Sequence, residues 1–139
     1  MIKPVVVVGS GFSGLAAAFH IAEAGIQVII LERKESLGGY FPELKRQFPT
    51  NSCGVCFMHP EYPAYCPYIE AERHENIKSY TSVKIDNIKY NDGEISISFK
   101  AAKDDLTIEA SALIFATGYE PFDVSKKPEL GGGIYNNVF

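Results

Sequence analysis

The feature that most constrains this 139-residue chain is a glycine-rich turn between a short apolar run and a helical pattern near its start. The β-branched run Val5–Val8 leads into Gly9-Ser10-Gly11-Phe12-Ser13-Gly14, and a second apolar run, Val28–Leu31, is followed by Glu32. Two parallel strands need a crossover connection, which is usually a helix. The sequence therefore predicts a βαβ unit and an α/β fold with a parallel sheet.

Each residue type in this turn suits a dinucleotide. Gly9 permits the tight turn, Gly11 leaves room for a pyrophosphate and Gly14 lets the helix pack close to the sheet. We also expect the backbone of Gly11 to adopt a conformation that needs glycine. The helix N-terminus offers N–H groups and partial positive charge to phosphates. The carboxylate of Glu32 can accept hydrogen bonds from ribose hydroxyls, which favours FAD or NAD over NADP. The alternative is an ordinary glycine-rich turn of an α/β protein. The predicted Rossmann-like site comprises Gly9, Gly11, Phe12, Ser13, Gly14 and Glu32.

The length suits one domain, residues 1–139, and the composition excludes some classes of function. The net charge is −4, with acidic and basic residues mixed along the chain, so we expect no nucleic-acid partner. No apolar stretch approaches the ~20 residues of a transmembrane helix. The odd number of cysteines, three, does not suit a secreted disulfide framework, so we expect a cytoplasmic location.

Hydrophobic periodicity predicts the remaining elements. A hairpin is indicated by Asn91-Asp92-Gly93, which lies between two runs of alternating apolar and polar residues. Together with a third run it forms a three-stranded antiparallel meander. The expected helices cover Ser13–Ala24 and Tyr68–Arg73; the expected strands cover Lys84–Tyr90, Glu94–Lys100, Leu106–Ala110 and Ala112–Ala116.

Residues 33–76 form a cysteine- and aromatic-rich insertion within the domain. Cys53 and Cys56 have Cys-x-x-Cys spacing, and Cys66 follows in the same segment. Three interpretations remain open. The three thiolates ligate an iron–sulfur cluster such as [4Fe–4S], with a fourth ligand from elsewhere. Alternatively, Cys53 and Cys56 form a redox dithiol beside a flavin, or all three are buried structural thiols.

The order of motifs resembles that of a known group of flavoproteins. The glycine turn, the acid after the second strand, Gly38-Gly39, the meander and Ala116-Thr117-Gly118 occur in the same order in the FAD domain of two-dinucleotide-binding flavoproteins of the thioredoxin-reductase-like group. The segment LGGYFPELKRQFPTNSCGVC is similar to the A subunit of heterodisulfide reductase and its relatives. Members of that family also carry a nicotinamide-domain-like insertion and ferredoxin-type cluster modules, which this chain lacks. It is therefore expected to be an N-terminal portion with an incomplete FAD domain.

The resemblance implies an FAD-dependent oxidoreductase that passes electrons between flavin and iron–sulfur centres within a multisubunit complex. The implied partners are iron–sulfur proteins and other subunits, one of which completes the flavin site. Two alternatives are a non-catalytic nucleotide-binding scaffold and a fragment of an NAD(P)H-dependent flavin disulfide reductase. The resemblance adds further cofactor-binding positions, namely Arg33, Gly38, Gly39, Val83, Ala116, Thr117 and Gly118.

Overall fold

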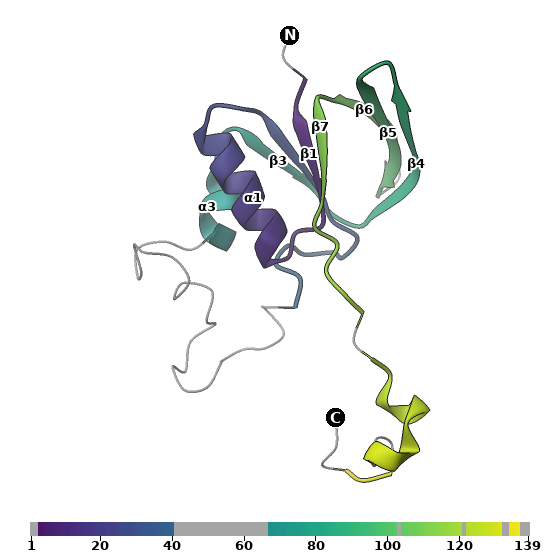
Figure 1. Cartoon of the computed structure of the whole chain (residues 1–139). Helices are drawn as coiled ribbons and strands as arrows, with labels where there is room; N and C mark the ends of the chain where they lie inside the picture. The colour runs from purple at the N-terminus through teal and green to yellow at the C-terminus, as the bar shows by residue number, and fades with distance from the viewer. Residues whose placement is uncertain (1–2, 41–66, 103, 121, 132–133, 137–139) are drawn as a thin grey trace.

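The computed structural model of the chain describes residues 3–40, 67–102, 104–120, 122–131 and 134–136 (Figure 1). The helices are α1 (Phe12–Glu23) and α3 (Pro67–Arg73), with two short 3₁₀ turns, η2 (Val124–Lys126) and η3 (Pro128–Leu130), near the C-terminus. The strands are β1 (Val5–Val8), β2 (Val28–Leu31), β3 (Ile77–Tyr80), β4 (Val83–Asn91), β5 (Glu94–Ala101), β6 (Asp104–Ala110) and β7 (Ala112–Phe115). Within the described residues, no helix is long and apolar enough to span a membrane.

Four strands form a parallel sheet in the order β3-β2-β1-β7. In register, Val6 of β1 lies between Ile29 of β2 and Leu113 of β7. Because all four strands run the same way, the turns after β1, β2 and β7 emerge at one edge of the sheet. The predicted parallel α/β fold is confirmed.

The other three strands form a separate antiparallel sheet in the order β4-β5-β6, which confirms the predicted meander. Asn91 pairs with Glu94, so the hairpin loop consists of Asp92 and Gly93. Both have positive φ, 48° and 86°, as the two-residue hairpin turn that matches strand twist requires.

The parallel sheet is the middle of three layers, and the side chains of β1 alternate between the two faces. Val6 and Val8 face the meander, where they share a core with Ile97 and Phe99 of β5. Val7 faces the helices and packs in a second core. Figure 1 shows α1 on one side of the sheet and β4–β6 on the other. The second core combines β1 and β2 with α1, α3 and the loop after β2, through Val7, Leu15, Ala18, Ala22, Val28, Ile30, Leu37 and Ala71.

Strand β3 is the described strand that the sequence did not predict. Its residues, Ile77-Lys78-Ser79-Tyr80, alternate weakly, and none is fully buried. Among the described strands it lies at the edge of the sheet and pairs with β2 alone. Its strand structure therefore depends on the backbone bonds that β2 offers, which local hydrophobic pattern does not reveal.

Candidate functional site

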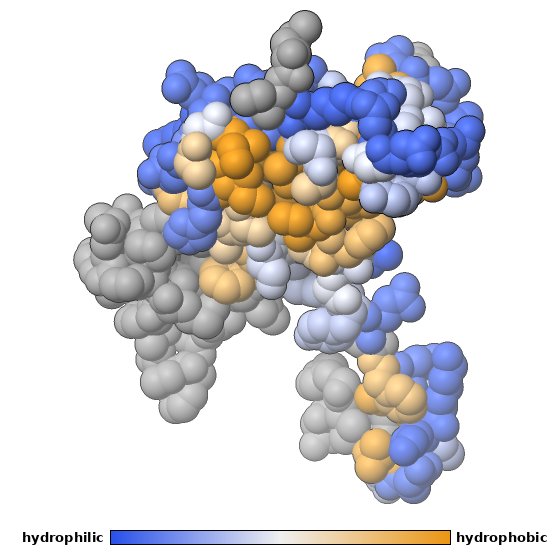
Figure 2. Space-filling model, turned by 45° about the horizontal axis from the view of Figure 1, so that its top comes forward, coloured by the Kyte–Doolittle hydropathy of each residue, from blue (hydrophilic) through white to orange (hydrophobic). Residues whose placement is uncertain are grey.

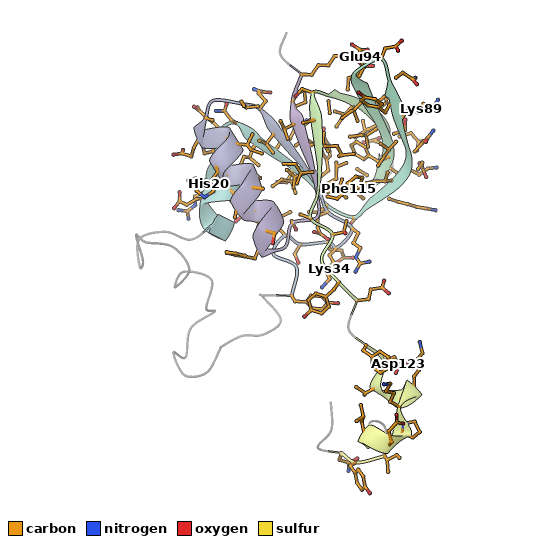
Figure 3. The ribbon with its side chains drawn as sticks, in the orientation of Figure 1. His20, Lys34, Lys89, Glu94, Phe115 and Asp123 are labelled. Carbon is orange, nitrogen blue, oxygen red and sulfur yellow. The ribbon has the colours of Figure 1, made fainter. Side chains whose placement is uncertain are left out.

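A cavity of about 670 Å³ lies where β1, β2 and β7 end. The glycine turn forms its floor, the end of β2 forms one side and the residues after β7 form the other. Figure 3 shows Lys34 and Phe115 near this end of the sheet, with the chain leaving β7 beside them. The described residues lining the cavity are Val8–Ser13, Leu31–Lys34, Gly39, Tyr40 and Ile114–Tyr119.

Two glycines of the turn are required by close packing. Gly9 has φ of +100°, and a Cβ built on it would lie 2.3 Å from the carbonyl oxygen of Ala116. A Cβ on Gly14 would lie 2.0 Å from the carbonyl oxygen of Gly9. These contacts join the start of α1 and the end of β7 to the turn, and they agree with the roles predicted for both glycines.

Gly11 has space beside it instead of a tight contact. A Cβ at this position would meet no described atom within 4 Å, although Gly11 lines the cavity. Its φ is −65°, which any residue adopts. The expectation that its backbone needs glycine geometry is therefore wrong. What remains of the predicted role is the free space above the backbone, and a ligand in the cavity would use that space.

The N-cap and the first residues of α1, Gly11, Phe12 and Ser13, line the cavity. Gly11 is the N-cap and brings no side-chain hydrogen bond to the helix start, and the first turn contains no acidic residue. The N-terminus of a helix attracts anions through its N–H groups and its dipole. With the open space at Gly11, this arrangement fits the pyrophosphate of a dinucleotide such as FAD.

Glu32 lies immediately after β2 and is 5% exposed. Its Oε2 accepts hydrogen bonds from the backbone N–H (2.8 Å) and the hydroxyl (2.5 Å) of Ser10, and its Oε1 accepts one from the backbone N–H of Lys34 (2.8 Å). Burial by itself opposes the charged form. The donors of Lys34, Ser10 and Arg33 outweigh it and lower the pKa of the Glu32 carboxyl. Glu32 is therefore a charged, hydrogen-bonded carboxylate in the wall of the cavity.

Ser10 is a site residue that the sequence reasoning missed. Its side chain is fully buried, and the same hydroxyl that donates to Glu32 accepts a hydrogen bond from the backbone N–H of Gly38 (3.2 Å). The carbonyl oxygen of Ser10 accepts from that N–H as well, at 2.9 Å. The one available signal was a small polar residue between two glycines of a predicted turn.

A second group lies around Lys34 and consists of Lys34, Tyr40 and Tyr119, of which the sequence reasoning missed Lys34 and Tyr119. The ammonium of Lys34 is 4.6 Å from the centre of the Tyr40 ring, and it donates to the carbonyl oxygen of Gly39 at 3.4 Å. The rings of Tyr40 and Tyr119 stack with their centres 6.0 Å apart. These residues bring the loop after β2 and the segment after β7 together at the cavity.

Most of the predicted cofactor-binding residues line the cavity. Gly14, Gly38 and Val83 are not among the described residues that line it; their predicted contact with a cofactor stays a prediction. The N–H of Val83 donates to the carbonyl oxygen of Glu32 at 2.9 Å, and its side chain is in the core beneath the meander. The lining residues that were predicted are Gly9, Gly11, Phe12, Ser13, Glu32, Arg33, Gly39, Ala116, Thr117 and Gly118.

The three cysteines, Cys53, Cys56 and Cys66, lie outside the described residues. Among the residues that are described, His, Cys, Asp and Glu side chains form no group that could hold a metal ion. The predicted iron–sulfur ligands therefore stay a prediction.

Comparison with curated proteins gives relatives that carry the predicted resemblance. The chain is 37% identical over 79 residues to the second iron-sulfur A subunit of the CoB–CoM heterodisulfide reductase of Methanopyrus kandleri, a match that covers 57% of this chain and 11% of that protein. It is 32% identical over 95 residues to the A subunit of the ferredoxin:CoB-CoM heterodisulfide reductase of Methanosarcina mazei, covering 68% of this chain and 11% of the relative. The predicted resemblance to heterodisulfide reductase A subunits is confirmed, and the chain spans about 11% of the length of these relatives.

Solved structures share the fold at low sequence identity. The L-proline dehydrogenase of P. horikoshii matches with a TM-score of 0.64 and 20% identity over 85% of this chain and 23% of that one. The thioredoxin reductase of Lactococcus lactis matches with a TM-score of 0.57 and 17% identity over 99% of this chain and 37% of that one. These likenesses confirm the predicted Rossmann-like fold.

A family model agrees with both comparisons over almost the whole chain. Residues 3–136 match the model described as pyridine nucleotide-disulphide oxidoreductase, a span that includes β1, the glycine turn, the meander and the residues after β7. The match supports the prediction that the protein is an oxidoreductase with FAD as its cofactor. The fold, the glycine turn and this match together show that the chain belongs to the pyridine nucleotide-disulphide oxidoreductase family.

Proposed function

We propose that this chain is the FAD-binding part of an electron-transfer oxidoreductase similar to the A subunit of heterodisulfide reductase. The observation that carries the proposal is the cavity, which extends from Glu32 past the glycine turn to Thr117 and Gly118. A dinucleotide lies across the carboxyl ends of the strands in folds of this type. The cavity offers a carboxylate at one end, a helix N-terminus at its centre and backbone at the other end.

The residues of this chain would bind and orient the cofactor. Glu32 accepts hydrogen bonds from the adenosine ribose, and the pyrophosphate lies above Gly11 at the start of α1. The backbone at Thr117 and Gly118 lies toward the flavin. When bound, FAD supplies hydride and single-electron chemistry, while the protein supplies binding and electrostatics.

The electron acceptor in this proposal is an iron–sulfur centre. One of the relatives is named as an iron-sulfur subunit and another as a subunit of a ferredoxin:CoB-CoM heterodisulfide reductase, which supports a partner of this class. Cys53, Cys56 and Cys66 are proposed ligands of one such centre. A cytoplasmic location is part of this proposal, because three cysteines do not suit a secreted disulfide framework.

A second polypeptide segment is proposed to complete the flavin site. Strand β7 lies at one edge of the parallel sheet, and Phe115 at its end is 64% exposed. Tyr119, in the segment that leaves β7, is 73% exposed. Figure 2 shows apolar side chains gathered on one face of the molecule. Large exposed apolar patches usually mark interfaces, and this supports association with another chain near the cavity.

The test identifies the bound nucleotide. The chain is purified together with its co-expressed subunits and denatured, the released nucleotide is separated, and its absorbance and mass are measured. Flavin absorbance with the mass of FAD is the expected result. Release of NAD without flavin, or of no nucleotide, would contradict the proposal and favour a nucleotide-binding scaffold.

The mass of the protein in solution, measured with and without co-expressed subunits, tests the proposed association. A monomer that holds stoichiometric FAD and is reduced by a nicotinamide donor contradicts it.

A further inference from the structure

Ser10 occupies the point where three loops of the site meet. It lies between the glycines of the β1–α1 turn and contacts Glu32 after β2 and Gly38 in the following loop. Ser10 is 0% exposed, so these contacts are made without competition from water. We propose that Ser10 is a positioning residue that holds Glu32 and the Gly38-Gly39 loop in place for the dinucleotide. The part of this inference that concerns affinity rests on the function proposed above.

The hydroxyl of Ser10 both donates and accepts a hydrogen bond. Its single proton points to Oε2 of Glu32, so the oxygen accepts from the N–H of Gly38. A hydroxyl that donates to a carboxylate becomes a better acceptor, because hydrogen bonds in a chain polarise one another. Ser10→Ala would remove the hydroxyl donor to Oε2 of Glu32 and leave the backbone N–H donor of residue 10.

The consequence for Glu32 is a fixed orientation. Oε2 is held by two donors from Ser10, and Oε1 is held by the backbone of Lys34. An ionised carboxylate has about four acceptor sites, and the three hydrogen bonds leave about one of them, on Oε1, for a ribose hydroxyl. A ribose hydroxyl therefore meets a carboxylate that is already charged and oriented, and it need not order the side chain.

The hydrogen bonds of Ser10 also hold the Gly38-Gly39 loop close to the β1–α1 turn. Gly38 N–H is bonded to both oxygens of Ser10, and a Cβ on Gly39 would lie 2.9 Å from the Cα of Gly11. Ser10 thereby keeps the loop beside Gly11, where the pyrophosphate is proposed to lie. Loss of the hydroxyl removes one of the two bonds to Gly38 and leaves the backbone bond.

The first experiment is a double-mutant cycle on FAD affinity, with Ser10→Ala, Glu32→Ala and the double variant of the full chain. We expect Ser10→Ala to weaken FAD binding by about ten-fold or more, the loss typical of a hydrogen bond to a charged group. In the Glu32→Ala background the same change is expected to weaken FAD binding less than in the wild type, because the hydrogen bond to Glu32 is already absent and only the bond to Gly38 is lost. Full additivity, or unchanged affinity in Ser10→Ala, overturns the proposal.

A matched control is Ser111→Ala, which removes an exposed hydroxyl bonded to the carbonyl oxygen of Pro4 at the far end of the sheet. It is expected to leave FAD affinity unchanged. If Ser10→Ala does not fold, Ser10→Cys replaces it, since the thiol is a weaker donor on a similar frame. A cysteine variant with wild-type affinity then overturns the proposal.

The second experiment does not depend on FAD. Carbon-13 NMR measures the pKa of the Glu32 carboxyl in the apo chain, where Arg33 and Lys34 are its charged sequence neighbours. We expect this pKa to rise in Ser10→Ala because a donor to the charged form is lost. An unchanged pKa overturns the role of Ser10. If the wild-type chain binds no FAD even with its co-expressed subunits but the pKa rises, the proposed function fails and the coupling between Ser10 and Glu32 stands.

Discussion

The carbonyl oxygen of Gly9 lies 2.0 Å from the position that a Cβ of Gly14 would take. Gly14 is in the first turn of α1, and Gly9 begins the turn after β1. The helix therefore starts against the backbone of the turn that precedes it. The contact shows that Gly14, like Gly9, is required by close packing, whereas Gly11 has open space beside it.

Gly14→Ala is expected to destabilise the fold. The added methyl cannot fit without moving the backbone of the glycine turn, and overpacking of this kind costs about 1–3 kcal/mol. Denaturant unfolding of the apo chain measures the change in the free energy of unfolding. A stability within experimental error of the wild type would show that the turn relaxes freely.

Gly11→Ala is the matched variant with the opposite expectation. Its methyl group meets no described atom and its φ is ordinary, so the apo stability is expected to stay within about 0.5 kcal/mol of the wild type. FAD affinity is expected to fall by about ten-fold or more, because the methyl occupies space proposed for the pyrophosphate. Calorimetric titration with FAD makes the comparison. If this variant binds FAD with wild-type affinity, the pyrophosphate does not lie beside Gly11.

Glu32→Gln should destabilise the apo chain by about 1–3 kcal/mol at neutral pH, since the amide can present only one oxygen to donors on both sides of the group.

The pH dependence of stability in the wild type follows from the lowered pKa of Glu32. A carboxyl whose pKa is lower in the folded state stabilises the fold above its unfolded value of about 4.3. That contribution is lost as the pH falls through the lower folded value. Unfolding measured from pH 7 to pH 3 should show a smaller loss of stability in the variant than in the wild type, and equal slopes would contradict the assignment.

The proposed cluster ligands are tested by chemical analysis of the purified protein with its partners. Cys53→Ser, Cys56→Ser and Cys66→Ser are each expected to lower the content of iron and acid-labile sulfide, because thiolates are the usual ligands of such clusters. Ser111→Ala serves as the control for an unrelated side chain. Iron content that stays unchanged in all three cysteine variants leaves the dithiol and structural interpretations.

The sequence by itself determined the parts of this protein that depend on local pattern. The β-branched run before Gly9 and the apolar run before Glu32 predicted β1, α1 and β2 because a crossover helix must connect parallel strands. Asn91-Asp92-Gly93 predicted the β4–β5 hairpin because its turn requires positive φ at two successive residues. The glycine turn and Glu32 predicted five of the residues that line the cavity, and the family resemblance predicted five more.

Only the tertiary structure decided what depends on contacts between distant segments. Strand β3 has little pattern of its own and is a strand because β2 pairs with it. Ser10 looks like any small residue in a turn, and it becomes a site residue because Glu32 and Gly38 approach it from 22 and 28 residues away. Gly11 and Gly14 belong to one motif, yet only the packing around them shows which needs glycine for the fold and which leaves space for a ligand. Hydrogen bonds and steric contacts of this range are set by the packed backbone, so the spacing of residues along the chain does not contain them.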